Sequence, residues 1–166
     1  ATVITFRKEL FGKTYQTVVY DQKLSDVFDL SEQADQYLNT GKLREAILLV
    51  EQQLRIDSEH PTPYAQLGRY YQLRAIAFTS SKKHAFLDKS LDSYNNALEL
   101  AKLFTPLKVL PNLKEMVSSQ MGLVFSARAI CKWEAGDIDG AIVDTETSLQ
   151  YDIPDYVRKE AKESLK

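Results

Sequence analysis

Two pairs of carboxylates are the residues of this chain whose types and spacing could support acid–base chemistry. Asp26 lies three residues before Asp29, and Asp137 lies two residues before Asp139. One member of such a pair could donate a proton while the other accepts one. Both pairs, however, flank predicted helix N-termini, where acidic side chains cap free N–H groups and favour the helix dipole. We therefore interpret them as capping residues.

Other catalytic or metal-binding patterns are absent from the sequence. It has no Gly-rich phosphate loop, no His–Glu helix motif and no strand–turn nucleophile. Zinc needs several Cys or His ligands at short spacing, whereas His60, His84 and Cys131 are far apart. We expect no catalytic residue, no metal and no cofactor. The two histidines are most simply exposed loop residues.

Cys131 lies in an apolar stretch and is expected to be a small buried hydrophobic residue. As the single cysteine it cannot form a disulfide within the chain, which favours the cytoplasm or another reducing compartment.

Composition limits the class of partner. The 166 residues fit one domain with one core, and 21 basic against 23 acidic residues give a net charge of −2. There is thus no overall basic field to attract nucleic acid or an anionic membrane. Charged residues interrupt the N-terminus early, so neither a signal peptide nor membrane insertion is expected.

Apolar residues recur at helical spacing over most of the chain. Ser25 is a plausible N-cap for the first helix, Thr62-Pro63 for the third and Asp137 for the sixth. We expect a turn over residues 79–83 and a proline-containing loop over residues 104–111. The predicted helices cover residues 26–39, 42–56, 63–78, a segment around 90–100, 112–134, 138–151 and 155–166.

Residues 2–20 are instead rich in Thr, Val, Tyr and Phe, which favours strand. A turn at Gly12-Lys13 would pair Leu10 with Tyr15 and Phe6 with Val19. One face would then collect Ile4, Phe6, Leu10, Tyr15 and Val19. A lone hairpin is marginal in water, so it must dock on the helices or pair with another chain. The alternative is a short helix over residues 3–11.

The stretch from Pro63 to Tyr71 carries the clearest packing pattern. Tyr64, Leu67 and Tyr71 share one helical face, and Gly68 lies among them where a side chain would push a neighbouring helix away. This pattern resembles the first helix of the tetratricopeptide repeat. The resemblance extends over residues 27–153 in three hairpins, with further matches at Leu30, Ala34, Tyr37, Gly41, Ala46, Ser90, Tyr94, Ala97 and residues 135–142.

The resemblance implies an all-α, right-handed stack of three helical hairpins. We expect an N-terminal β-hairpin extension over residues 1–24 and a helical domain over residues 25–166, with the last helix as a solvating cap.

In this family the first helices line a concave groove, and the resemblance places groove residues accordingly. Arg69 would be its cation, either holding a partner carboxylate or lying solvated over aromatic rings. Trp133 could anchor a partner, although core packing is the favoured interpretation. Some family members hold the terminal carboxylate of a chaperone with a Lys and an Asn. Ser31 and Asp35 do not reproduce that pair, so we do not expect this use here. The groove positions are Ser31, Asp35, Leu38, Ala65, Arg69, Gln72, Ser126, Ile130 and Trp133.

The function implied by the resemblance is protein or peptide binding, as an adaptor, assembly factor or scaffold without chemistry of its own. One alternative is a structural oligomer that self-associates through the N-terminal strands. A helical enzyme with a site between helices is the third.

Overall fold

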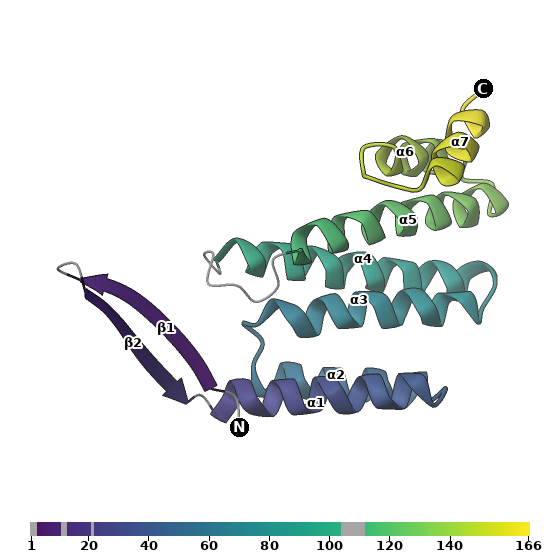
Figure 1. Cartoon of the computed structure of the whole chain (residues 1–166). Helices are drawn as coiled ribbons and strands as arrows, with labels where there is room; N and C mark the ends of the chain where they lie inside the picture. Colours follow the sequence, from purple (N-terminus) through teal and green to yellow (C-terminus); the bar gives the residue numbers. More distant parts are fainter. Residues whose placement is uncertain (1–2, 11–12, 21, 104–111) are drawn as a thin grey trace. The chain divides into compact units, whose positions relative to one another are not determined.

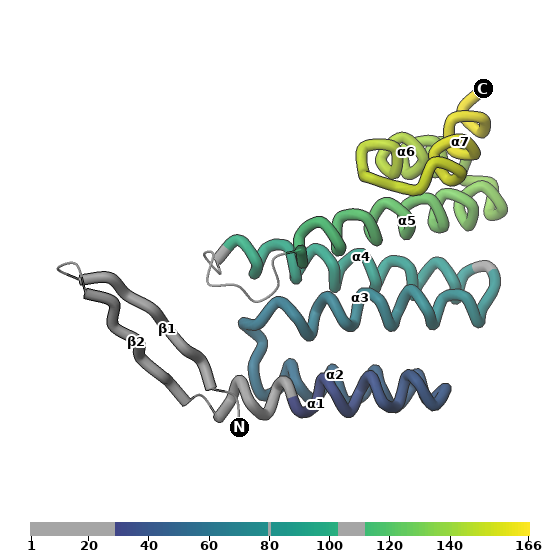
Figure 2. Tube along the Cα trace, in the orientation of Figure 1, coloured from purple at the N-terminus to yellow at the C-terminus, as the bar shows by residue number. Residues whose placement is uncertain are grey.

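The computed structural model of the chain describes residues 3–10, 13–20, 22–103 and 112–166, with side chains from residue 29 onward except those of residues 80 and 103 (Figures 1 and 2). Contacts divide the chain into two compact units, Ala1–Ser58 and Glu59–Lys166, and each is described by itself. Every described element from residue 22 onward is an α-helix, which confirms the all-α prediction for this part of the chain. None of these helices is both long and apolar enough to cross a lipid bilayer.

The N-terminal unit begins with two antiparallel strands, β1 (Val3–Leu10) and β2 (Lys13–Tyr20). Phe6 lies opposite Thr17 rather than Val19, so the register differs by two residues from the predicted one. Glycine suits either central position of a two-residue hairpin loop, so Gly12 alone does not select a register. The side chains of the predicted apolar face lie outside the described residues.

Two helices complete this unit, α1 (Gln22–Asn39) and α2 (Leu43–Ile56), which pack against each other as a hairpin (Figure 1). Ser25 lies inside α1 and is not its N-cap, because helical backbone already begins at Gln22. Small residues contribute to the buried positions of both helices, with Ala34 in α1 and Ala46 in α2 fully buried.

The C-terminal unit contains two further helical hairpins and a last short helix (Figure 1). Within it α3 packs on α4, α4 on α5, and α5 on α6, while α7 contacts both α5 and α6. Leu91, Tyr94, Val117 and Val124 are among the residues of its continuous core. The helices are α3 (Pro61–Ile76), α4 (Ser80–Leu103), α5 (Leu113–Glu134), α6 (Ile138–Ser148) and α7 (Asp155–Ser164).

The α1–α2 turn and the α5–α6 turn have the same hydrogen-bond pattern. Gly41 and Gly136 have φ angles of +76° and +83°, in the left-handed region that glycine adopts without strain. Each glycine N–H donates to the carbonyl three residues earlier at 3.0 Å, and the following N–H donates to the carbonyl five residues earlier at 2.9 Å. These two bonds form the Schellman motif that satisfies the last carbonyls of a helix.

The predicted starts of two helices in the C-terminal unit are wrong. The N-cap of α3 is His60, not Thr62, and the His60 Nδ1 atom accepts from the Thr62 N–H at 3.2 Å. His60 is buried, so it is not the exposed loop residue that the sequence suggested. α4 already begins at Ser80, inside the predicted turn, because residues 80–83 contain no glycine or proline to stop a helix. The predicted loop over residues 104–111 lies outside the described residues.

Gly68 permits close packing of α3 on α4, as predicted. A Cβ atom at Gly68 would lie 2.5 Å from two carbons of the Tyr94 ring, far inside van der Waals contact. The Ser90 hydroxyl donates to the Gly68 carbonyl at 2.6 Å, and the Tyr94 hydroxyl donates to Gln72 Oε1 at 3.1 Å. Burial raises the pKa of Tyr94, so this phenol remains a hydrogen-bond donor.

A second glycine has the same role in α5. A Cβ atom at Gly122 would lie 2.5 Å from Ile153 and 2.6 Å from Tyr151, in the segment between α6 and α7. Gly122 is followed three residues later by Phe125, as Gly68 is by Tyr71. Phe125 stacks on Tyr151 with ring centroids 5.8 Å apart. The chain therefore makes two glycine-dependent contacts with similar local sequence, one between α3 and α4 and one between α5 and the segment that precedes α7.

Candidate functional site

An open, mostly apolar cleft lies where α5, α6 and α7 meet. Its volume is about 320 Å³, near the lower end of the range of ligand pockets, roughly 300–1,000 Å³. We call it the C-terminal cleft. The residues that line it are Ser126, Ala129, Ile130, Trp133, Ala141, Ile142, Thr145, Glu160, Ala161, Ser164 and Leu165.

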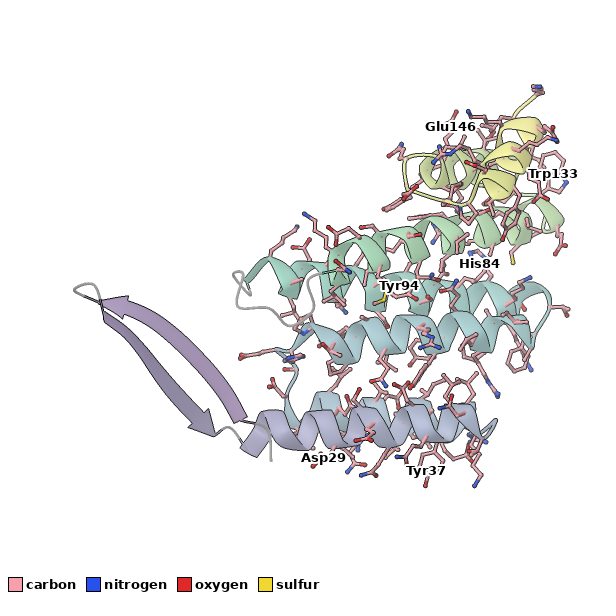
Figure 3. The ribbon with its side chains drawn as sticks, in the orientation of Figure 1. Asp29, Tyr37, His84, Tyr94, Trp133 and Glu146 are labelled. Atoms are coloured by element: carbon pink, nitrogen blue, oxygen red, sulfur yellow. The ribbon has the colours of Figure 1, made fainter. Side chains whose placement is uncertain are left out.

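Helical spacing places the α5 residues of the cleft. Ser126, Ile130 and Trp133 lie at i, i+4 and i+7, which is one face of a helix. Ile130 is 56% exposed and Trp133 is 58% exposed, so two large apolar side chains of this face are open to solvent. Figure 3 shows Trp133 near the C-terminal end of α5, beside α7.

The favoured interpretation of Trp133 as a core residue is therefore wrong. Successive helical residues point about 100° apart, so apolar sequence neighbours do not share an environment. Cys131 is buried as predicted, and burial raises the pKa of its thiol. Trp133, two residues later, turns away from that buried face into the cleft.

The other two helices supply an apolar wall and one charge. Ile142 of α6 is 39% exposed and Leu165, just after α7, is 37% exposed. Glu160 of α7 is the one charged residue among those lining the cleft. Sequence reasoning assigned no role in binding to these three residues. A signal was available for α6 alone, whose four apolar residues Ile138, Ala141, Ile142 and Val143 are more than one buried face of a short helix needs.

A charge network holds α4, α5 and α6 together. Arg128 of α5 makes two hydrogen bonds of 2.7 Å to the Asp144 carboxylate of α6 and a third of 2.9 Å to Asp88 of α4. Lys132 lies 3.0 Å from the same Asp144 carboxylate, whose side chain is only 2% exposed. His84 lies 3.6 Å from Asp88.

The pKa values follow from this geometry. Burial alone would raise the pKa of Asp144, but the hydrogen bonds and charges of Arg128 and Lys132 hold it below its ordinary value. The bidentate bond to Asp144 raises the pKa of Arg128. Both groups remain charged at neutral pH, and the network fixes the α5 helix that carries Ile130 and Trp133. The sequence analysis did not predict this charge network. A signal for it was that Arg128 and Lys132 of α5 and Asp144 of α6 stand among apolar residues.

The remaining predicted groove residues lie on other helices. Arg69 is exposed on α3, whereas Gln72 of α3 is half-buried and accepts the Tyr94 hydrogen bond, and Ala65 is buried. Asp35 and Leu38 lie on α1, in the N-terminal unit, with Asp35 exposed and Leu38 half-buried. The structure thus brings Ser126, Ile130 and Trp133 together in one cleft.

Comparison with models of known protein families gives no match for this chain, and no curated protein is similar to it in sequence. Among the described residues, no group of three or more His, Cys, Asp and Glu side chains is arranged to hold a metal ion. The candidate site therefore rests on its own geometry, which is that of an exposed apolar surface with one carboxylate.

Proposed function

We propose that the chain is a protein-interaction module that binds a segment of another protein in the C-terminal cleft. The observation that carries this proposal is the exposure of Trp133, Ile130 and Ile142 around one hollow. Exposed apolar side chains that gather around a hollow mark an interaction site more often than a scattered surface residue does. An aromatic side chain at such a place is typical of a binding hot spot.

The proposed architecture is a tetratricopeptide-like, right-handed stack of helical hairpins, or solenoid. Three consecutive helical hairpins, two identical glycine turns and two glycine-dependent helix contacts support it. In such a stack one face of successive first helices forms a groove. On this proposal the exposed Arg69 of α3 is a further position of the peptide-binding groove in the C-terminal unit, and Asp35 and Leu38 of α1 are the groove positions of the N-terminal unit.

The cleft indicates what the bound segment carries. An apolar or aromatic side chain of the partner would bury the exposed parts of Trp133 and Ile130. Each 100 Å² of apolar surface removed from water contributes about 2.5 kcal/mol before the cost of association. A basic residue beside that anchor would pair with Glu160. We therefore propose a segment with one large apolar residue next to Lys or Arg, and an adaptor or scaffold role for the chain.

Self-association is the second candidate function. β1 and β2 form a sheet of only two strands, so each presents an edge that could pair with another copy of the chain. Sedimentation velocity over a range of protein concentrations separates the two functions, because only self-association makes the sedimentation coefficient rise with concentration.

The proposal is tested with peptides selected from a random displayed library against the whole chain. Their affinities are then measured by titration calorimetry for the wild type, Trp133→Ala and Glu160→Lys. We expect each substitution to weaken binding by about 2 kcal/mol, the size of a hot-spot loss.

Matched controls use exposed residues outside the cleft lining. Met116 of α5 is 50% exposed, and Glu146 of α6 is also exposed (Figure 3). Met116→Ala and Glu146→Lys should leave the affinity unchanged. Equal losses in cleft variants and controls, or selected peptides that bind all four variants as tightly as the wild type, would contradict the proposal.

A further inference from the structure

The overall charge balance of the chain conceals one strongly basic stretch. From His60 to Leu87 the sequence contains no Asp or Glu, but it contains Arg69, Arg74, Lys82 and Lys83. The stretch covers α3 and the first two turns of α4. These two helices pack against each other as a hairpin, so the cations of the stretch lie on two neighbouring helices.

Aromatic rings lie between the cations. Phe86 of α4 stacks on Phe78 with ring centroids 5.3 Å apart, and on Tyr71 of α3 at 6.3 Å. Arg74 lies 5.1 Å from the Phe78 ring centroid and Lys82 lies 5.7 Å from it. These contacts are within the distance of a cation–π interaction.

Lys89 extends the arrangement by two turns of α4. Its Nζ atom lies 5.5 Å from the Tyr71 ring and 5.7 Å from the Phe86 ring. Lys89 and Lys82 are exposed, while the rings are half-buried. We call this set the basic–aromatic cluster: Tyr71, Arg74, Phe78, Lys82, Phe86 and Lys89.

The cations of the cluster are not neutralised within the described part of the chain. Arg74, Lys82 and Lys89 make no ion pair there, whereas Arg128, Lys132 and Lys102 elsewhere in the unit do. The nearest acid in sequence, Asp88, is held by Arg128 at 2.9 Å. Asp92 is exposed on α4 one turn beyond Lys89 and marks the edge of the cluster.

We propose that the basic–aromatic cluster is a second binding surface, for an acidic segment of a partner protein. The rings hold the cations in place, since each ring face attracts the positive groups above it. Ammonium and guanidinium groups are donors without acceptors, and carboxylates are their complementary partners. Preorganised cations lose less side-chain entropy when they bind a carboxylate than freely moving ones do.

The geometry favours a peptide over single-stranded nucleic acid. Base recognition needs open ring faces on which bases can stack. Here the rings stack on one another and carry the chain's own cations. Lys82 and Lys89 are seven residues apart on α4, or about 10 Å along the helix. A peptide in the polyproline II conformation has three residues per turn and rises about 3.1 Å per residue, so acidic residues at i and i+3 share one face about 9 Å apart and reach both lysines.

The test uses a fluorescein-labelled peptide of about twelve residues with Glu at every third position, and fluorescence anisotropy as the readout. The whole chain is compared with the double variant Lys82→Glu/Lys89→Glu. The control is Lys159→Glu/Lys162→Glu, which makes the same charge change at exposed positions of α7. Thermal unfolding of each variant checks that the fold is retained.

We expect the cluster variant to bind the acidic peptide at least tenfold more weakly, and the control variant less than twofold. The variant Lys82→Gln/Lys89→Gln should give an intermediate loss without introducing repulsion. Trp133→Ala should bind this peptide normally, so the result is independent of the C-terminal cleft. Equal losses in the cluster and control variants would overturn the proposal, as would tighter binding of labelled oligouridylate or phosphatidylserine vesicles than of the acidic peptide.

Discussion

Replacing Gly68 by alanine tests the packing of α3 on α4 with a single added methyl group. Helix propensity alone predicts that Gly68→Ala stabilises the chain by about 1 kcal/mol. The structure predicts the opposite sign. The new Cβ would lie 2.5 Å from Cδ1 and Cε1 of Tyr94 and 2.8 Å from Cγ, whereas carbon atoms prefer about 3.5–4.0 Å.

The Tyr94 ring cannot move aside easily. It is 1% exposed, and its hydroxyl donates to Gln72 at 3.1 Å. Overpacking of a core typically costs about 1–3 kcal/mol, and so short a contact with a fixed ring belongs in the upper part of that range, about 2–3 kcal/mol. After a propensity gain of about 1 kcal/mol, we expect a net destabilisation of about 1–2 kcal/mol. With a urea dependence of about 2 kcal/mol per molar, the unfolding midpoint falls by about 0.5–1 M.

Equilibrium urea unfolding, followed by circular dichroism, measures this shift. Tyr94→Leu removes the ring that the methyl group meets, so in that background Gly68→Ala should be neutral or stabilising. The double-mutant cycle should give a coupling of at least 1 kcal/mol. Stabilisation by Gly68→Ala in both backgrounds would refute the close contact and the helix pairing built on it.

Four further predictions concern single elements. Asp144→Asn should lower the free energy of unfolding at pH 7 by about 3 kcal/mol, because it leaves Arg128 and Lys132 without their buried partner. The pKa of Asp144 is lowered on folding, so its contribution is present above the unfolded pKa of about 4 and is lost as pH falls through the folded value. Urea unfolding at about pH 3 should thus show a smaller difference between wild type and variant, and a constant difference would contradict the assignment. Trp133→Ala should change the urea midpoint little, since the side chain is 58% exposed. Arg69→Glu should also leave the urea midpoint unchanged. It should weaken the binding of any selected peptide that carries a carboxylate, and titration calorimetry measures that loss. Deletion of residues 1–20 should leave the far-ultraviolet helical signal of the chain largely intact, and its collapse would show that the strands are needed for folding.

Helix number and order, and half of the helix boundaries, could be predicted because they depend on local signals. α2 and α5 match their predicted spans to within a residue, and Asp137 caps α6 by accepting from the Gly140 N–H at 3.0 Å. Gly68 was identified because its aromatic neighbours repeat at helical spacing. Such signals act over three or four residues, so they can be identified without knowing which distant residues meet.

Features that depend on contacts between distant residues could not be predicted. Arg128 meets Asp144 sixteen residues away and Asp88 forty residues away, and no local pattern encodes those distances. The exposure of Trp133 depends on which side of α5 the helices α6 and α7 cover. The basic–aromatic cluster was obscured by a net charge of −2, because acids elsewhere in the chain balance its cations. The net charge of a whole chain does not show where residues of one sign lie close together.

Hydrogen–deuterium exchange of the whole chain, with and without the tightest selected peptide, tests the C-terminal cleft as a binding site most directly. We expect slower exchange in α5, α6 and α7 at the segments that carry Trp133, Ile142 and Glu160. The Trp133→Ala variant mixed with the same peptide should show no such slowing. Protection confined to β1 and β2, or to the α3–α4 hairpin, with residues 126–165 unchanged, would contradict it.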